Sequence, residues 1–266
     1  MLEHHASQAE GLLRLASQNG PRMLAVVNHG DEHAELPLLW QLCLALVGFG
    51  YAVTVLDATT QESEANPGLA DLLENAHWHD NASRDTSAWM VIPAETGIQN
   101  LCALYSQKSL RQLGHLFPQE GVVILYCKVE WMIPLIAYTG IEPLLAVSQS
   151  RTSLITSYLA LKRLLIAGKL KPTIVNMIQD QSHALRVLDQ QTFRNLSDCA
   201  KKFLDQDVKA LSIVEQLDGE HQNDDIQSLA LRLMENALPL DNGNTLPTLN
   251  SHVPHFRQVD HFAGSH

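Results

Sequence analysis

The chain has 266 residues, and its 18 basic and 29 acidic side chains give a net charge of -11 at pH 7. A charge of this sign repels nucleic acids and anionic membrane surfaces at long range, which disfavours both as partners. The sequence has no signal-peptide pattern and no uninterrupted apolar run of about 18 residues, so we expect a cytoplasmic protein without stable membrane insertion. Its four cysteines are scattered without CxxC spacing, which predicts buried, reduced thiols.

The predicted elements alternate between short β-branched runs and stretches with helical spacing. Strands are expected at 22–28, 52–57, 88–93, 121–126, 143–148, 172–178 and 208–214, and the clearest helices at 36–48, 151–168, 182–204 and 224–238. Pro37 is expected near the first position of its helix, and Thr152 or Ser153 is expected to cap the helix at 151–168. The alternation predicts an α/β fold with a mainly parallel, seven-strand sheet flanked by helices. The segment 239–266 lacks an apolar period and is expected to be a disordered tail.

The loop after the first predicted strand is unusually rich in acids and histidines. A strand–loop–helix at this place in an α/β protein commonly binds phosphate, because the helix N-terminus presents free N–H groups. Here the loop offers His29, Asp31, Glu32, His33 and Glu35 instead. We expect one of the three carboxylates to accept the hydrogen bonds that a bound anion would otherwise take. The alternative is a metal site, since His29 and His33 are four residues apart.

Five stretches in fixed order resemble the MinD/ParA-type P-loop ATPases, and within them the FlhG (FleN) branch of flagellar-number regulators. The stretches are "ASQAEGLLRLA" (6–16), "GYAVTVLDATT" (50–60), "NPGLADLLENA" (66–76), "WMVIPAETGIQNL" (89–101) and "LLAVSQSRTSLITSYLALKRL" (144–164). The last is the most specific, because "TSL" begins a helix directly after a strand and the tyrosine and lysine follow in register. The resemblance implies a MinD/ParA-like P-loop fold for residues 21–238.

The phosphate-binding loop of that family, G-K-G-G-x-G-K-T, corresponds to residues 29–36, counted back from Asp57 without a gap. Gly30 and Glu35 stand where the family has its two lysines, and Leu36 replaces the hydroxyl that holds magnesium. Exchanging a lysine for a glutamate beside a phosphate turns attraction into repulsion. The sequence therefore predicts a degenerate loop that does not hold nucleotide phosphate.

Two further nucleotide positions also differ from the family. Thr59 replaces the second aspartate of the D-A-D motif, which positions the attacking water, and Tyr126 replaces the magnesium-linked Walker B aspartate. Because parts of one catalytic apparatus are lost together, we predict a pseudo-ATPase with no catalytic, cofactor-binding or metal-ligating residues. The alternative within the enzyme class is an ATPase with an unorthodox site.

The N-terminal segment 1–20 resembles the D-Q-A-x-x-L-R docking helix of the FlhG branch. Gln8, Ala9 and Leu12 match this pattern, while the arginine comes one place late, at Arg14. The resemblance implies that these four residues bind an FlhF-like, signal-recognition-type GTPase. Packing of this helix on its own domain is the alternative. We expect a regulator or scaffold in flagellar or polar-apparatus assembly, and related branches serve pilus placement and cellulose secretion.

Overall fold

The computed structural model describes residues 20–74, 89–103, 110, 112–178, 196, 198–202, 205–214 and 224–240. The strands are β1 (Arg22–Asn28), β2 (Ala52–Asp57), β3 (Trp89–Pro93), β4 (Gly121–Lys128), β5 (Leu144–Val147), β6 (Thr173–Ile178), β7 (Lys209–Val214) and β8 (Leu238–Pro239). The helices are α2 (Glu32–Gly48), α3 (Leu69–Glu74), α4 (Glu95–Ala103), α6 (Val129–Ile136), α7 (Arg151–Arg163) and α9 (Asp224–Glu235), with a 3₁₀ turn at Gln112–Leu116 and a π-helical turn at Leu164–Gly168. The predicted docking helix, the predicted tail and most of the predicted helix 182–204 lie outside the described residues.

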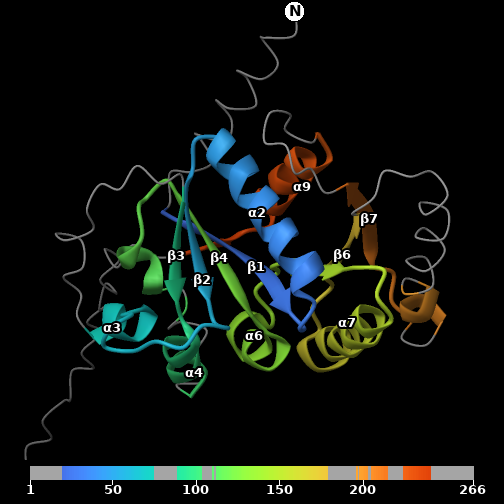
Figure 1. The fold of residues 1–266 in the computed structure, drawn as a ribbon, viewed down its shortest axis with the longest axis horizontal. Coiled ribbons are helices and arrows are strands. Elements are labelled where there is room, and N and C mark those ends of the chain that lie inside the picture. The colour runs from blue at the N-terminus through green and yellow to red at the C-terminus, as the bar shows by residue number, and fades with distance from the viewer. Residues whose placement is uncertain are drawn as a thin grey trace, which may run out of the picture.

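The seven predicted strands form one parallel sheet in the order β3-β2-β4-β1-β5-β6-β7 (Figure 1). This confirms the fold class expected from the alternation of strands and helices. An eighth strand of two residues, β8, pairs antiparallel with the start of β1 and was not predicted. It follows α9, which ends at Glu235 rather than continuing to residue 238. A backbone bond from the Leu240 N–H to the Pro21 carbonyl (2.8 Å) extends this pairing.

Helices cover both faces of the sheet and create two hydrophobic cores. On one face α2 and α9 pack side by side over β1, β2 and β4 (Figure 1), and on the other α3, α4, α6 and α7 form the second layer. Side chains of β1 alternate between the cores, with Leu24 and Val26 in the first and Ala25 and Val27 in the second. Each fully buried aliphatic side chain contributes about 1.5–3 kcal/mol to stability. Within the described residues, no helix has both the length and the apolarity that a membrane crossing requires.

Two predicted helix starts differ from the structure. Helix α2 begins at Glu32, so that Pro37 lies inside it rather than at its first position. The Asp31 carbonyl accepts from the Ala34 and Glu35 N–H groups, and these bonds start the helix before the proline. The cap of α7 is Ser150, whose side chain accepts from the Ser153 N–H (3.0 Å). The prediction of Thr152 or Ser153 as the cap was therefore wrong by two or three residues.

Alkaline pH is expected to destabilise the fold through its thiols, of which Cys43 and Cys127 are buried as predicted, while Cys102 and Cys199 are half-buried. Burial raises the pKa of the Cys43 thiol on α2 from 9.0 to about 12, and burial also raises the pKa of Cys102 and Cys127. Because the folded pKa of Cys43 exceeds the unfolded value, its contribution to stability is complete below pH 9 and is lost as the pH rises from 9 towards 12. The loss from one such thiol is about 1.4 kcal/mol per pH unit.

Urea denaturation of the wild type and of Cys43→Ala between about pH 8 and about pH 10.5 tests this expectation. The variant should be less stable at neutral pH because it has a cavity, yet its stability should fall less steeply above pH 9. Cys102 and Cys127 are present in both proteins and contribute to the fall of stability with pH in each. If the free energies of unfolding of the two proteins fell equally steeply with pH, the role assigned to Cys43 would be contradicted.

Candidate functional site

The Glu35 side chain lies under the loop between β1 and α2 and is fully buried. Its Oε1 accepts hydrogen bonds from the backbone N–H groups of His29 and Asp31, both at 2.9 Å. Its Oε2 accepts from the Asn28 side-chain amide at 2.8 Å and from the Tyr126 hydroxyl at 2.5 Å. The Asn28 amide also donates to the Tyr126 oxygen (2.8 Å), which closes a three-membered network. One carboxylate thus receives four donors, of which two are backbone amides of the loop.

Tyr126 reaches this network from the carboxyl end of the central strand β4. Its strand neighbours are Val26 in β1 and Asp57 in β2. Burial raises the pKa of the Tyr126 phenol, and the hydrogen bond to Glu35 and the charge of Glu35 raise it further. The phenol therefore keeps its proton, which it donates to the Glu35 carboxylate.

Asp31 ties the same loop to the turn between β5 and α7. Its Oδ2 accepts from the Ser148 N–H at 3.1 Å, and the side chain is almost completely buried. The Ser153 hydroxyl oxygen accepts from the same N–H at 2.9 Å. Of the three acids considered as acceptors, Glu35 takes the loop amides, Asp31 bonds across to the next turn, and Glu32 is exposed. The expected carboxylate acceptor is therefore Glu35 for the loop amides before α2, whereas the N-terminus of α2 itself has no side-chain cap.

The alternative of a metal site in this loop depends on His29, whose ring is engaged within the protein. Its Nε2 lies 2.7 Å from the Ala146 carbonyl oxygen, and its Nδ1 lies 2.8 Å from the Thr156 hydroxyl. A carbonyl oxygen only accepts, so Nε2 carries a hydrogen and cannot also bind a metal. Among the residues that the structure describes, no group of three or more His, Cys, Asp or Glu side chains could hold a metal ion.

Asp57, at the carboxyl end of β2, is held by the loop that follows it. The Asp57 Oδ1 accepts from the Thr59 N–H (2.9 Å) and hydroxyl (2.6 Å), and its Oδ2 accepts from the Thr60 hydroxyl (2.7 Å). The resemblance assigns position 59 to an aspartate that orients water. In this chain the position holds Thr59, which donates two hydrogen bonds to Asp57.

The Glu62 carboxylate joins this loop to the N-termini of α3 and α4. Its Oε1 accepts from the Ala70 N–H at 2.7 Å, and its Oε2 accepts from the N–H groups of Thr96 (2.5 Å) and Gly97 (3.0 Å). A carboxylate is favoured at this place because the positive ends of two helix dipoles meet there. Glu62 was not predicted from the sequence, since its partners are 8 to 35 residues away in the chain.

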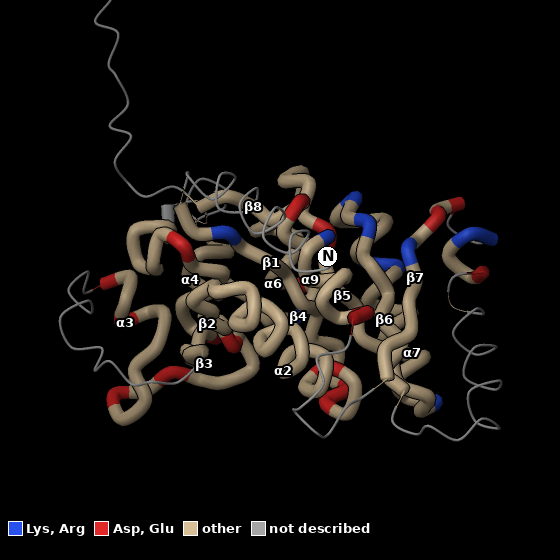
Figure 2. Tube along the Cα trace, turned by 90° about the horizontal axis from the view of Figure 1, so that it is seen from above, with Lys and Arg blue, Asp and Glu red and all other residues tan. Residues whose placement is uncertain are grey.

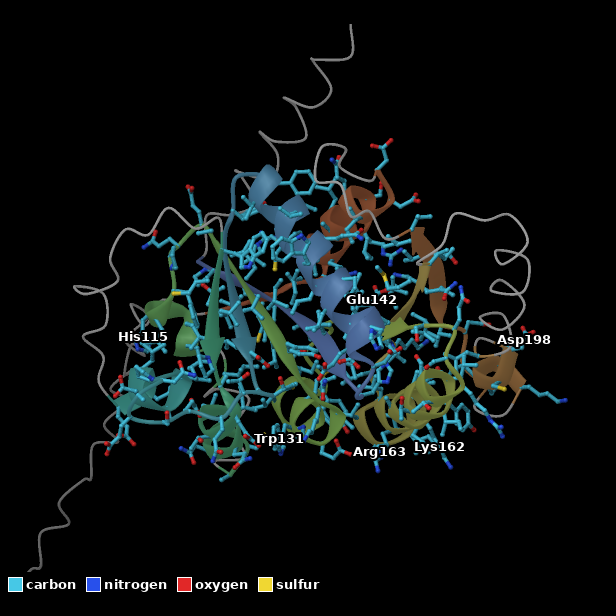
Figure 3. The ribbon with its side chains drawn as sticks, in the orientation of Figure 1. His115, Trp131, Glu142, Lys162, Arg163 and Asp198 are labelled. Carbon is cyan, nitrogen blue, oxygen red and sulfur yellow. The ribbon has the colours of Figure 1, made fainter. Side chains whose placement is uncertain are left out.

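A pocket of about 290 Å³ remains open beside the loop, between the residues that follow β1 and β4. The sheet reverses its winding between these two strands, which is the usual place for a ligand in an open α/β sheet. Gly30, Lys128 and Arg163 contribute to the wall. Arg163 is hydrogen-bonded to Glu130, and the Lys128 Nζ lies 5.3 Å from the centre of the Trp131 ring; Trp131 and Arg163 are labelled in Figure 3.

The four residues predicted to dock a GTPase, Gln8, Ala9, Leu12 and Arg14, lie outside the described residues. Their role stays a prediction. The structure describes instead a set of internal acceptors at the carboxyl edge of the sheet. Asn28 donates to one of these acceptors, Glu35, and only its position as the last residue of a predicted strand pointed to it.

No family model matches this chain, and a search of curated proteins found no match. Several solved structures are similar. MinD cell division protein from Aquifex aeolicus has a TM-score of 0.53 at 12% identity, with 82% of this chain and 99% of that chain covered. The MinC:MinD cell division protein complex from the same organism gives 0.51 at 11% identity, covering 78% and 85%.

A third similar structure is cobyrinic acid a,c-diamide synthase from Mycobacterium smegmatis, which was solved with bound ADP and magnesium. Its TM-score is 0.50 at 14% identity, with 80% of this chain and 91% of that chain covered. Identities this low establish a common fold and no more. The parallel sheet, its strand order and these similarities together show that the described part of the chain has the MinD/ParA-like P-loop fold.

Proposed function

We propose that this chain is a MinD/FlhG-like pseudo-ATPase, a non-catalytic regulator or scaffold that acts through protein contacts in flagellar or polar-apparatus assembly. The observation that carries the proposal is the buried Glu35 carboxylate, which accepts hydrogen bonds from the loop N–H groups of His29 and Asp31. In a phosphate-binding loop such amides point at the anion. Here the chain supplies its own anion, covalently attached and already desolvated.

Charge strengthens this argument. Two unit charges about 4 Å apart repel by about 4 kcal/mol at an effective dielectric constant of 20. A nucleotide phosphate at the loop would meet Glu35 directly and Asp31 nearby, whereas the family supplies lysine. Displacing Glu35 would also leave the Tyr126 hydroxyl without its acceptor and the Asn28 amide with the Tyr126 oxygen alone. Both effects oppose nucleotide binding.

The hydrogen bonds of the loop after β2 favour a single conformation of this loop. Asp57 is occupied by Thr59 and Thr60, and Glu62 fastens the loop to two helices. A nucleotide switch needs a segment whose contacts change with the ligand. Loops held by internal carboxylates suit a scaffold better than a switch.

Calorimetric titration with ATP and magnesium at moderate salt tests the central claim. We expect no ATP affinity tighter than about millimolar and no hydrolysis, because repulsion of the size given above removes several factors of ten in affinity. The same protein sample should show a cooperative thermal transition, which proves that it is folded. Binding in the micromolar range would overturn the proposal and favour the ATPase with an unorthodox site.

The partner part of the proposal depends on Gln8. If the N-terminal segment docks on an FlhF-like GTPase, Gln8→Ala should leave the melting temperature unchanged and abolish stimulation of the GTPase. Gln18→Ala is the matched control, since Gln18 lies in the same segment but outside the matched pattern. Stimulated GTP hydrolysis is the measurement. A wild-type protein that neither binds nor stimulates the GTPase would contradict the flagellar assignment.

A further inference from the structure

A second pocket, of about 360 Å³, lies at the opposite edge of the sheet, where β5, β6 and β7 begin. Its walls come from the residues that follow α6 and the π-helical turn and from the residues that lead into the three strands. This volume is at the lower end of the range for small-molecule sites, which limits an occupant to a small compound. The pocket is independent of the loop site and of the function proposed above.

The two acids in the pocket wall are already neutralised by partners. Glu142 accepts from Thr173 and from the Lys209 ammonium (2.8 Å) and lies 3.8 Å from Arg232. Burial alone would raise the pKa of the Glu142 carboxyl, but the bonds from Lys209 and Thr173 and the charges of Lys209 and Arg232 outweigh it and lower the pKa. This carboxylate is therefore ionised and committed to its neighbours. Figure 3 labels Glu142.

The second acid in the wall, Asp207, is bound to the Lys201 ammonium at 2.6 Å. The wall also contains Lys169 and Lys171, which are exposed. The structure shows no carboxylate paired with either lysine among the residues it describes. The pocket thus has two available ammonium groups, although the chain as a whole carries a charge of -11.

One long segment that contributes to the pocket wall is free of acids. Residues 143–179 contain no aspartate and no glutamate, while they include Lys169 and Lys171. In the view of Figure 2, most Lys and Arg segments gather on the side of β5, β6, β7 and α7, and the side of α3 and β3 carries mainly Asp and Glu. The pocket wall itself contains three lysines and two acids, and this excess of positive charge favours an anion.

Two residues of the pocket adopt a backbone conformation that suits glycine. Tyr138 has φ = 64° and Lys169 has φ = 52°, and both line the pocket. Gly140 is also left-handed (φ = 83°), so the turn after α6 contains two such residues. Gly168 is not, and the left-handed conformation next to it falls on Lys169. Such conformations cost free energy for L-residues and persist where the surrounding structure or a function requires them. The Tyr138 side chain is 82% exposed, so burial of its ring does not account for the strain.

We propose that this pocket binds a small phosphate monoester that carries an aromatic ring. The ammonium groups of Lys169 and Lys171 hold the phosphate dianion, and Tyr138 offers a flat face to the ring. Charge-assisted hydrogen bonds favour a phosphate between two ammonium groups, and aromatic pairs add a directional contact. Both residues lie at the C-terminal end of a helical segment, where a left-handed residue is common, and both line the pocket.

Titration of the full chain with phenyl phosphate, inorganic phosphate and phenol tests this proposal. Phenyl phosphate should bind saturably and more tightly than either fragment, and added salt should weaken it. Lys171→Gln and Lys169→Gly should each weaken binding by about tenfold, as expected for the loss of one charge-assisted contact. Lys162→Gln is the matched control, because Lys162 is exposed in the same acid-free segment but does not line the pocket.

Thermal unfolding provides a second measurement. If Lys169 had only a structural role, a change in melting temperature would not be accompanied by weaker binding. Lys169→Gly should raise the melting temperature, since glycine relieves the left-handed strain, while the same variant binds phenyl phosphate less well. No saturable binding to the wild type, equal binding to Lys169→Gly and wild type, or equal affinities for phenyl phosphate and inorganic phosphate would each overturn the proposal. The ATP titration is unaffected by these outcomes, so the two proposals fail separately.

Discussion

Replacing Glu35 with alanine is expected to lower the free energy of unfolding by about 3–5 kcal/mol, because it removes the acceptor of four buried or half-buried donors. These donors are the N–H groups of His29 and Asp31, the Asn28 amide and the Tyr126 hydroxyl. Each buried donor left without a partner costs about 1–3 kcal/mol, and entry of water into the vacated space reduces the sum. The melting temperature should fall by roughly 10 °C for a chain of this size.

Glu32→Ala is the matched control on the same helix. Glu32 is exposed, so its replacement should change stability by no more than about 0.5 kcal/mol. Glu35→Gln should fall between the two, because its carbonyl oxygen still accepts while its NH₂ group faces other donors. If Glu35→Ala melts within a few degrees of the wild type, the carboxylate network does not hold the loop.

Gly68→Ala is expected to cost about 3 kcal/mol or more, because a methyl group has no room at this position. A Cβ built on Gly68 would lie 2.1 Å from the Pro93 carbonyl oxygen and 2.6 Å from the Glu62 Cγ. The first contact is with backbone at the end of β3, which cannot move without disturbing the sheet. The second would displace the carboxylate that caps α3 and α4. Chemical denaturation at neutral pH measures the loss.

Gly50→Ala separates this packing effect from the conformational freedom of glycine. Gly50 has φ = +88°, and nothing lies within 4 Å of a Cβ placed there. Its replacement should therefore cost only about 1 kcal/mol, from the left-handed backbone alone. Gly68 is not left-handed, so a loss as small as that of Gly50→Ala would show that the contact with Pro93 is relieved at little cost.

The strands could be predicted from the sequence to within a residue or two at most ends because a buried strand needs a continuous β-branched apolar run. β8 could not be predicted, since two residues carry no period, and its pairing with β1 depends on where the chain returns after α9. The start of α2 was placed late because Pro37 satisfies a local rule for helix starts. Backbone bonds to Asp31 and the burial of Glu35 set the start earlier.

The sequence by itself determined the parallel α/β fold, the acidic loop where a lysine-rich one is typical, and the prediction that a carboxylate would replace the missing anion. Those features depend on residue type and local order, which are present in the chain before it folds. The tertiary structure decided that Glu35 takes the loop amides, that Asp31 bonds to Ser148, and that Glu62 joins two helices. Hydrogen bonds of this kind link residues as far apart as Glu35 and Tyr126, 91 positions in the chain, which only the register of the sheet brings within reach.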